Sequence, residues 1–565
     1  MQSSPVSEES KAFDSNILLY EKESVANMKL TLNGIKETAA WEAAGIKLPS
    51  YSIEQVAEET KKAPVWVHFG AGNIFRIFIG GLADRLIAQG EMKKGITCVE
   101  TFDFDVVDKI YKPYDNLVLA VTLKADGSTD KQVIGSLAEA IKAQSNVPEE
   151  WNRLKEIFTD PGLQMISFTI TEKGYALKNA EGNYFPFVQA DIDNGPEKPG
   201  AAMAVVCALL FERFKAGKHP LAVVSMDNCS HNGEKLQNSI LTMAKEWEKK
   251  GFVGADFVAY LSDEKQISFP WSMIDKITPR PDAKVQQMLA DDGFEDNYTI
   301  VTEKHTFTAP FVNAEETQYL CIEDHYTNGR PPLELGGVLY CDRETVDKIE
   351  KMKVCTCLNP LHTAMSIYGC MLDYTLISAE MADEDLRAFI QKIGYIEAMP
   401  VVVDPGVLNP YEFIGAVINR RLPNPFMPDA PQRIATDTSQ KLAIRFGETI
   451  KAYEARGLDK SNLVLIPLVL AGYARYLKGI DDNGKAFEIS PDPMLAELQA
   501  IVAPLEVKEG EQDFSCLKNL YSRADIFGVD LYAVGLGEQI EGMVKELYAG
   551  NGAVRKTLHK YVVAR

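Results

Sequence analysis

The chain has 565 residues, of which 46% are hydrophobic and 25% are charged, as in an ordinary globular protein. This length exceeds what one hydrophobic core usually holds, so we expect two large domains. The longest apolar stretch, residues 201–211, is shorter than the roughly 20 residues that span a bilayer. A formal net charge of −21 argues against binding to nucleic acid or to an anionic membrane. A small anionic substrate is not excluded, because a few local cations can reverse the field inside a cleft.

The first 16 residues are polar and acidic, without the basic start and apolar stretch of a signal peptide. We therefore expect a cytoplasmic protein, either a monomer or a small homo-oligomer. The nine cysteines are scattered and lie within apolar segments. This distribution favours free thiols in a reducing compartment over a framework of disulfides.

Residues 1–62 are predicted to form a polar N-terminal extension, with a helix that begins near Ser52 and ends before Pro64. From Val65, short apolar runs alternate with amphipathic segments, which is typical of a parallel sheet with helices on both faces. Residues 63–343 should therefore form an α/β, Rossmann-type doubly wound domain that binds a dinucleotide. The strands expected there are 65–70, 96–102, 117–123, 165–171, 221–227 and 257–261.

After residue 344 strand-like runs nearly vanish, and longer helical segments replace them. Residues 344–353, 383–393 and 495–502 are examples. We therefore predict that residues 344–565 form a mainly α-helical domain that supplies substrate-binding and catalytic groups.

A glycine pair, Gly70 and Gly72, follows the first strand and precedes the first helix. Backbone N–H groups at such a turn can approach a pyrophosphate. The third glycine of the usual G-x-G-x-x-G pattern is replaced by Phe75, so a tight turn without a ligand is the alternative. Acidic residues after the second strand favour NAD over NADP, because a carboxylate binds ribose hydroxyls and repels a 2′-phosphate. A solvated acidic loop is the alternative. The candidate cofactor-binding residues are Gly70, Gly72, Asn73, Phe75, Arg76, Glu100, Asp103, Asp105 and Glu172.

Polar clusters at residues 171–175, 227–233, 275–279 and 350–362 follow or lie near the ends of predicted elements. Ligands bind at the carboxyl ends of strands in open α/β sheets, although turns and helix caps also explain such clusters. The last cluster contains Lys353, Asn359 and His362. A lysine with a lowered pKa can accept a proton from an alcohol as hydride leaves, while amide and imidazole groups hold the oxygen. On a charged helix, a solvated surface lysine is the alternative.

Cys355, Cys357 and His362 also suggest a zinc site. No second cysteine pair lies at ligand spacing, and the two cysteines sit in an apolar run, so we expect no metal.

Several motifs together resemble those of the mannitol dehydrogenase and fructuronate reductase family, the long-chain polyol dehydrogenases. They occur in the same order and the similarity covers about residues 64–560. The matching segments are the glycine loop with Arg76, T-E-K-G-Y at 171–175, D-N-x-x-x-N-G at 227–233, D-K-I-T-P at 275–279, and further matches at 322–331, 424–441, 470–477 and 492–493.

The resemblance implies a metal-independent oxidoreductase that moves hydride between NAD(H) and the carbonyl of a linear keto-uronate or ketose. D-Fructuronate/D-mannonate is the first expectation, with mannitol and tagaturonate as alternatives. A different class of function, an NAD(H)-binding sensor without catalysis, also fits the fold. The implied roles are Lys353 as general acid and base, Asn228, Asn359 and His362 on the reacting oxygen, Glu350 in proton exchange, Asp275 in the active site, and Arg433 and Lys441 at the substrate, with Arg420 or Arg421 as further cations for a carboxylate.

The spacing between Lys353 and Asn359 departs from the family pattern. The family usually places its lysine five positions before the asparagine, whereas Lys353 and Asn359 are six apart and Pro360 follows Asn359. A bulge or a shifted helical register would restore the geometry, and a helix-breaking proline favours such a distortion. Otherwise Lys353 points elsewhere and has no catalytic role.

Overall fold

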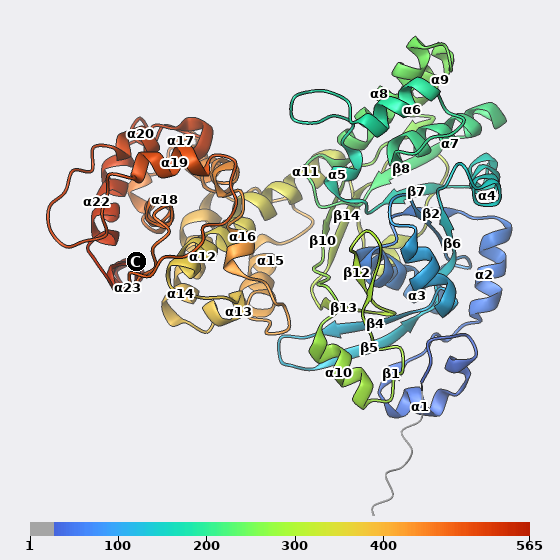
Figure 1. The fold of residues 1–565 in the computed structure, drawn as a ribbon, viewed down its shortest axis with the longest axis horizontal. Coiled ribbons are helices and arrows are strands. Elements are labelled where there is room, and N and C mark those ends of the chain that lie inside the picture. The colour runs from blue at the N-terminus through green and yellow to red at the C-terminus, as the bar shows by residue number, and fades with distance from the viewer. Residues whose placement is uncertain (1–27) are drawn as a thin grey trace, which may run out of the picture.

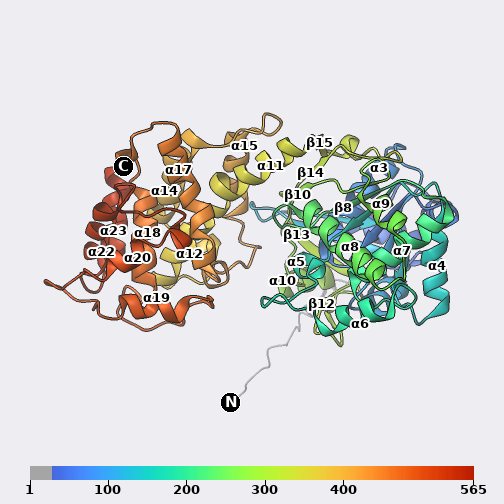
Figure 2. The same ribbon diagram turned by 90° about the horizontal axis from the view of Figure 1, so that it is seen from above.

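The structure is a computed structural model that describes residues 28–565. A sheet-containing part and a helical part lie side by side, and helix α11 (Arg343–Met352) lies where they meet (Figure 1). The view from above shows the same two parts with α11 between them (Figure 2).

A six-stranded, fully parallel sheet forms the centre of the first part, in the order β6-β3-β2-β7-β8-β9. The chain order reverses between β2 and β7, which is the point where doubly wound sheets bind ligands. The strands are β2 (Trp66–Phe69), β3 (Ile96–Glu100), β6 (Leu137–Lys142), β7 (Met165–Phe168), β8 (Leu221–Ser225) and β9 (Ile267–Ser268).

Successive side chains of a strand point to opposite faces of the sheet. Both faces of this sheet are apolar, and helices cover both of them. Val67 and Phe69 belong to one core, with α4 (Pro148–Thr159), α7 (Ala202–Gly217) and α8 (Asn232–Lys249). Trp66 belongs to the other core, with α2 (Ile53–Lys62) and α3 (Gly80–Ala88). The remaining helices of this part are α1 (Thr38–Ala43), α5 (Thr171–Tyr175), α6 (Pro186–Asn194), α9 (Ala255–Ser262) and α10 (Ala283–Asp291).

Smaller sheets complete the first part. β4 and β5 are antiparallel, and β13 and β1 flank them in parallel. β14 pairs antiparallel with β10 and parallel with β15, and β11 and β12 form a hairpin. The bounds are β1 (Ile46–Lys47), β4 (Val118–Leu123), β5 (Thr129–Ile134), β10 (Ser272–Asp275), β11 (Ile300–Val301), β12 (Phe307–Thr308), β13 (Phe311–Glu315), β14 (Tyr319–Glu323) and β15 (Leu339–Cys341).

The second part is built around α18 (Leu465–Tyr476), whose twelve residues are all buried. Helices α12 (Asn359–Met371) and α22 (Gly537–Leu547) pack against it within one large hydrophobic core. The other helices are α13 (Ile377–Glu380), α14 (Glu384–Lys392), α15 (Pro410–Ala416), α16 (Pro431–Ile434), α17 (Glu448–Ala455), α19 (Leu495–Val502), α20 (Leu517–Tyr521), α21 (Ala524–Phe527) and α23 (Ala553–Ala564). Between residues 28 and 565, none of the helices has the length and apolar character needed to cross a membrane.

The predicted fold class is confirmed, with two corrections to the strands. Residues 257–261 lie in helix α9, because Phe257, Tyr260 and Leu261 are buried at helical spacing. A short apolar run does not distinguish a strand from a buried helix. Residues 118–123 do form a strand, but β4 belongs to the second sheet and pairs antiparallel with β5.

The N-terminal segment is part of the fold from residue 28 onward. Trp41 is fully buried against Phe294, and Met28 bridges to Phe294. The helix predicted after Ser52 is α2, and the Ser52 hydroxyl caps it by accepting the N–H of Gln55. Residues 1–27 lie outside the described residues. The domain boundaries at residues 62 and 343 stay predictions.

Gly70 provides a test of the first strand-to-helix turn. A Cβ atom there would lie 2.2 Å from the Thr169 carbonyl oxygen, and the φ of +107° is strained for any other residue. We expect Gly70→Ala to lower the free energy of unfolding by more than about 2 kcal/mol. Gly72→Ala is the matched control, since a Cβ there meets no atom within 4 Å. Equal stabilities of the two variants in denaturant titrations would contradict this account.

Candidate active site

The glycine loop lies between β2 and the first helix, at the reversal of strand order. Gly70 donates its N–H to Val99 O at 2.8 Å and approaches the β7 loop so closely that no side chain fits. Gly72 is exposed, with open space beside it, and the helix starts at the next residue. A helix N-terminus with an open approach fits a pyrophosphate.

Two residues of this loop face the interior and not the open side. Phe75 is fully buried and stacks on His68 with ring centroids 4.3 Å apart. Arg76 is also fully buried, and its guanidinium donates to the carbonyls of Ala309 and Pro310 at 2.8 and 3.2 Å. The first helical turn directs both side chains into the core, and the cofactor contact expected for Phe75 and Arg76 stays a prediction. Asn73 is half-buried at the helix start.

The acidic residues after β3 have partners within the protein. One carboxylate oxygen of Glu100 accepts the Ala71 N–H at 2.9 Å, and the other accepts the N–H groups of residues 101–103. Glu100 thus ties the end of β3 to the glycine loop. Asp103 accepts hydroxyl protons from Thr302 and Thr306, and Asp105 pairs with Lys109 at 2.7 Å. Their contact with a ribose stays a prediction.

The motif residues after β7 and β8 form a scaffold. Asp227 accepts the N–H groups of Ile170 and Thr171 and the hydroxyl of Tyr175. Thr171 has a positive φ of 64°, which these bonds hold in place. Asn232 bonds to both the N–H and the carbonyl of Ser272 at 3.0 Å. These bonds fix the loop that carries Asn228. Glu172 is exposed and pairs with Lys235.

Lys353 lies on a π-helical turn, Lys353–Cys357, that directly follows α11. The Leu358 N–H donates to Lys353 O at 3.1 Å, a bond that spans five residues. A π turn holds one more residue than an α turn, and such turns are frequent at functional sites. The extra residue between Lys353 and Asn359 is therefore accommodated as the bulge that the sequence suggested.

The Lys353 ammonium is buried among groups of the first part. Its Nζ donates to Asn228 Oδ1 at 3.0 Å and to Ile274 O at 3.2 Å, and lies 3.2 Å from Asp275 Oδ1. Burial lowers its pKa from the usual lysine value, while the Asp275 carboxylate opposes that shift. Three predicted site residues, Lys353, Asn228 and Asp275, are thus brought together from two parts of the chain.

Arg421 extends this arrangement into a buried chain of charges. Its guanidinium contacts Asp275 Oδ2 at 2.5 Å and Glu315 Oε1 at 3.0 Å, and all three side chains are at most 4% exposed. Although burial alone would raise it, the pKa of Asp275 is lowered to about 2 by Arg421 and Lys353. Arg421 is therefore held by two carboxylates, which corrects the expectation that it could bind a substrate carboxylate. Arg420 is exposed.

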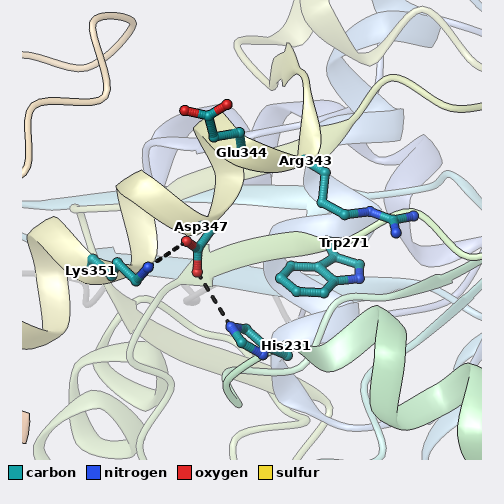
Figure 3. A pocket seen from close by; sticks show the side chains of 6 residues that line it. All are labelled: His231, Trp271, Arg343, Glu344, Asp347 and Lys351. Atoms are coloured by element: carbon teal, nitrogen blue, oxygen red, sulfur yellow. Dashed lines mark hydrogen bonds and ion pairs between the residues drawn. The ribbon is translucent and has the colours of Figure 1, made fainter.

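Glu350 lies on α11, one turn before Lys353, and accepts the His231 backbone N–H at 3.4 Å. The His231 ring stacks on Trp271, with centroids 4.4 Å apart, and reaches Asp347 at 3.3 Å. Figure 3 shows His231 and Lys351 both pointing to Asp347. The three residues help to line an open pocket of about 490 Å³. These contacts fasten the loop that carries Asn228 to the helix that leads to Lys353.

Asn359 and His362 lie in the first turn of α12 and are partly exposed. Burial lowers the pKa of His362 to about 3, and the nearby Arg421, Arg445 and Arg433 contribute in the same direction. The His362 imidazole is therefore neutral near pH 7, with both a donor and an acceptor nitrogen.

A group of cations surrounds His362. The Arg433 side chain is 70% exposed and forms a bidentate pair with Asp429 at 2.6 and 2.7 Å. Burial, Arg445 and Arg433 lower the pKa of Lys441 to about 8, and the Lys441 ammonium donates to Ile434 O at 3.3 Å. Arg445 was not predicted, although it lies four residues after Lys441, the spacing of neighbours on one helical face. Its guanidinium donates to the Thr363 hydroxyl.

Among residues 28–565, no three histidine, cysteine, aspartate or glutamate side chains lie together as a metal site would require. Cys355, Cys357 and His362 therefore form no such cluster.

Comparison with known proteins identifies the family of the chain. Residues 64–318 match the model of the mannitol dehydrogenase Rossmann domain, and residues 345–548 match that of the mannitol dehydrogenase C-terminal domain. The chain belongs to the mannitol dehydrogenase family. Asn228 and Asp275 lie within the first match, and Lys353 and Arg421 within the second, so the charge chain joins the two family domains.

Individual relatives extend this finding. A D-mannonate oxidoreductase of Thermotoga maritima is 51% identical over 95% of this chain and 99% of its own length. Two solved structures share the fold at 24% identity. A D-sorbitol dehydrogenase has a TM-score of 0.75 and covers 91% of this chain and 98% of its own. The Pseudomonas fluorescens mannitol 2-dehydrogenase, solved with NAD and D-mannitol, has a TM-score of 0.68 and covers 95% of this chain and 100% of its own.

Replacement of Arg421 tests how far the buried chain of charges stabilises the fold. We expect Arg421→Gln to lower the free energy of unfolding by about 3–5 kcal/mol, because Asp275 and Glu315 would remain buried without their shared partner. The neighbouring exposed Arg420→Gln is the matched control and should change stability by less than about 0.5 kcal/mol. Denaturant unfolding of both variants at pH 7 measures the difference. Wild-type stability of Arg421→Gln would refute the role given to Arg421.

Proposed function

We propose that the protein interconverts D-mannonate and D-fructuronate by transferring hydride to and from a nicotinamide dinucleotide. The observation that carries this proposal is the contact of the buried Lys353 Nζ with Asn228 Oδ1 and Asp275 Oδ1. The 51% identity to a D-mannonate oxidoreductase supports the choice of substrate.

Lys353 serves as the general acid and base. In its neutral form it accepts the hydroxyl proton of the sugar acid, and as an ammonium it returns that proton to the carbonyl oxygen. The hydride is accepted or supplied by the bound nicotinamide. Asn228, Asn359 and His362 donate hydrogen bonds to the reacting oxygen, and a neutral His362 can do so from one ring nitrogen. Glu350, beside His231, passes protons between Lys353 and solvent. This proton chemistry uses an amine and amides and needs no metal.

NAD is the proposed cofactor. Gly70 and Gly72 leave an open helix N-terminus for the pyrophosphate, with Asn73 beside it. The carboxylates of Glu100 and Asp103, at the end of β3, disfavour the 2′-phosphate of NADP through repulsion. Asp105, which follows β3, and Glu172, which follows β7, are proposed to belong to the same cofactor site.

The substrate carboxylate is proposed to lie near Arg433, Lys441 and Arg445. Arg433 and Arg445 both lower the pKa of His362 and of Lys441, although Arg433 is also paired with Asp429. A carboxylate would supply negative charge here, whereas a neutral polyol would not. This arrangement favours a sugar acid over mannitol.

An assay at 340 nm tests the function directly. We expect oxidation of NADH, faster than of NADPH, with D-fructuronate, and weaker activity with D-tagaturonate or D-fructose. Arg445→Gln should raise KM for D-fructuronate while NADH binding is unchanged. Binding of NADH with no turnover of any of the three sugars would instead indicate a sensor.

Replacement of the lysine tests its role. Lys353→Ala should lower kcat by about 10²–10⁴, the usual contribution of general acid and base catalysis. NADH affinity, measured by fluorescence, should remain. Lys351→Ala is the matched control, because this exposed lysine near the end of α11 pairs with Asp347. Similar losses in both variants would argue against a specific role for Lys353.

The pH dependence follows from the lowered pKa of Lys353. Oxidation of mannonate needs the neutral amine, so kcat/KM should rise with pH and level off below the pKa of a free lysine. Reduction of fructuronate needs the ammonium and should decline over the same range. Asp275 stabilises the ammonium, so Asp275→Asn should shift both profiles to lower pH.

Glu344→Gln is the control for this measurement, since Glu344 is exposed on α11 and pairs with Lys348. A shift of the Asp275→Asn profiles to higher pH would overturn the assignment.

A further inference from the structure

Cys321 and Cys341 are in direct contact beneath α11. Their Sγ atoms lie 3.0 Å apart, and the S–S bond of a disulfide is about 2.05 Å long. Cys321 is in the middle of β14 and Cys341 ends β15, two positions further along the parallel pair. A two-residue offset places both side chains on the same face of this sheet. The two thiols are therefore already positioned for bond formation.

We propose that Cys321 and Cys341 form a redox-active dithiol that closes to a disulfide, with Cys341 as the thiol that reacts first.

The two thiols differ in their exposure to solvent. Cys321 is only 1% exposed, and it belongs to a small core with Met273, Val346 and Ile349. Cys341 is partly exposed at the edge of that core. A dissolved oxidant thus reaches Cys341 first, and Cys321 can act only after it.

The two thiols also differ in acidity. The hydrogen bond from Cys321 lowers the pKa of the Cys341 thiol, although burial and the carboxylates of Asp342, Glu323 and Asp324 oppose this shift. All nine cysteines lie within the described residues, and in the other eight the thiol pKa is raised, chiefly by burial or, in Cys321, by its bond to Cys341. Because the thiolate is the nucleophile, Cys341 should be the most reactive thiol.

The reaction is an exchange with a small-molecule disulfide, RSSR. The Cys341 thiolate attacks one sulfur of RSSR, forms a mixed disulfide and releases RS⁻. Cys321 then loses its proton and attacks Cys341 Sγ, which releases the second RS⁻. The dithiol is oxidised by two electrons, RSSR is reduced to two RSH, and no other reactant is required.

The disulfide would add a covalent bond between β14 and β15, beside the start of α11, which lies where the two parts of the molecule meet. Asp342, directly after Cys341, caps α11 by accepting the Thr345 N–H at 2.7 Å. β14 belongs to the sheet that includes Asp275 on β10, and α11 leads to Lys353. A disulfide would anchor the start of α11 to that sheet. It would also stabilise the fold by closing the loop between residues 321 and 341.

The test uses the full chain and the aromatic disulfide 5,5′-dithiobis(2-nitrobenzoate) under native conditions. In the wild type, we expect a fast phase that releases two thionitrobenzoate anions and leaves no adduct on the protein. Cys321→Ser should release one anion and retain an adduct at Cys341. Cys341→Ser should lose the fast phase, and Cys516→Ser, a partly exposed thiol elsewhere, should behave as wild type.

Peptide mapping after equilibration with oxidised glutathione should identify a Cys321–Cys341 linkage. The oxidised protein should unfold at a temperature at least about 2 °C higher than the reduced protein. A retained adduct on the wild type, a fast phase that survives Cys341→Ser, or a linkage between other cysteines would overturn the proposal. None of these readouts depends on the proposed enzyme activity.

Discussion

The interaction on which the site depends is the buried chain of charges that runs from Lys353 through Asp275 and Arg421 to Glu315. Lys353 and Arg421 come from the helical part, and the two carboxylates come from strands of the sheet-containing part. Neither a lysine nor an arginine tolerates burial alone, so each needs the carboxylates of the other part. The same contacts that join the two parts therefore influence the pKa of Lys353, the proposed general acid and base. Assembly and acid–base chemistry are coupled through one carboxylate, Asp275.

Local backbone features place Asn228, Asn359 and His362 near these buried charges. The π turn after α11 absorbs one additional residue, so that Lys353 faces Asn228 while Asn359 and His362 begin the next helix. Asp227 and Asn232 hold the loop around Asn228 through backbone bonds, and Asp347 with Glu350 ties that loop to α11. Each of these supporting residues forms a hydrogen bond that restricts the movement of a backbone or side-chain group. The position of the site is thus fixed both by the loop that carries Asn228 and by helix α11.

The sequence predicted the α/β and helical parts because their hydrophobic periods differ, and it located the glycine loop because few residues permit that turn. It did not show that Phe75 and Arg76 face inward, since a motif names positions and not the direction of a side chain. Residues 257–261 were assigned to a strand because five apolar residues contain too little of either period. The pairing of Arg421 with Glu315 and the position of Arg445 near His362 depend on contacts between segments distant in sequence, which no local pattern contains.

The way the N-terminal segment is packed has a consequence for biosynthesis. Met28 and Trp41 contact Phe294, and β4 pairs with β13 at residues 311–315. The ribosome makes about 5–20 residues per second, so these early segments wait roughly 10 to 55 s for their partners. During that interval the edge of β4 that pairs with β13 has no partner, and the indole of Trp41 lacks its contact with Phe294. The first part of the molecule therefore completes its core only shortly before α11 emerges, and the growing chain is most exposed to aggregation or chaperone binding before residue 315 is made.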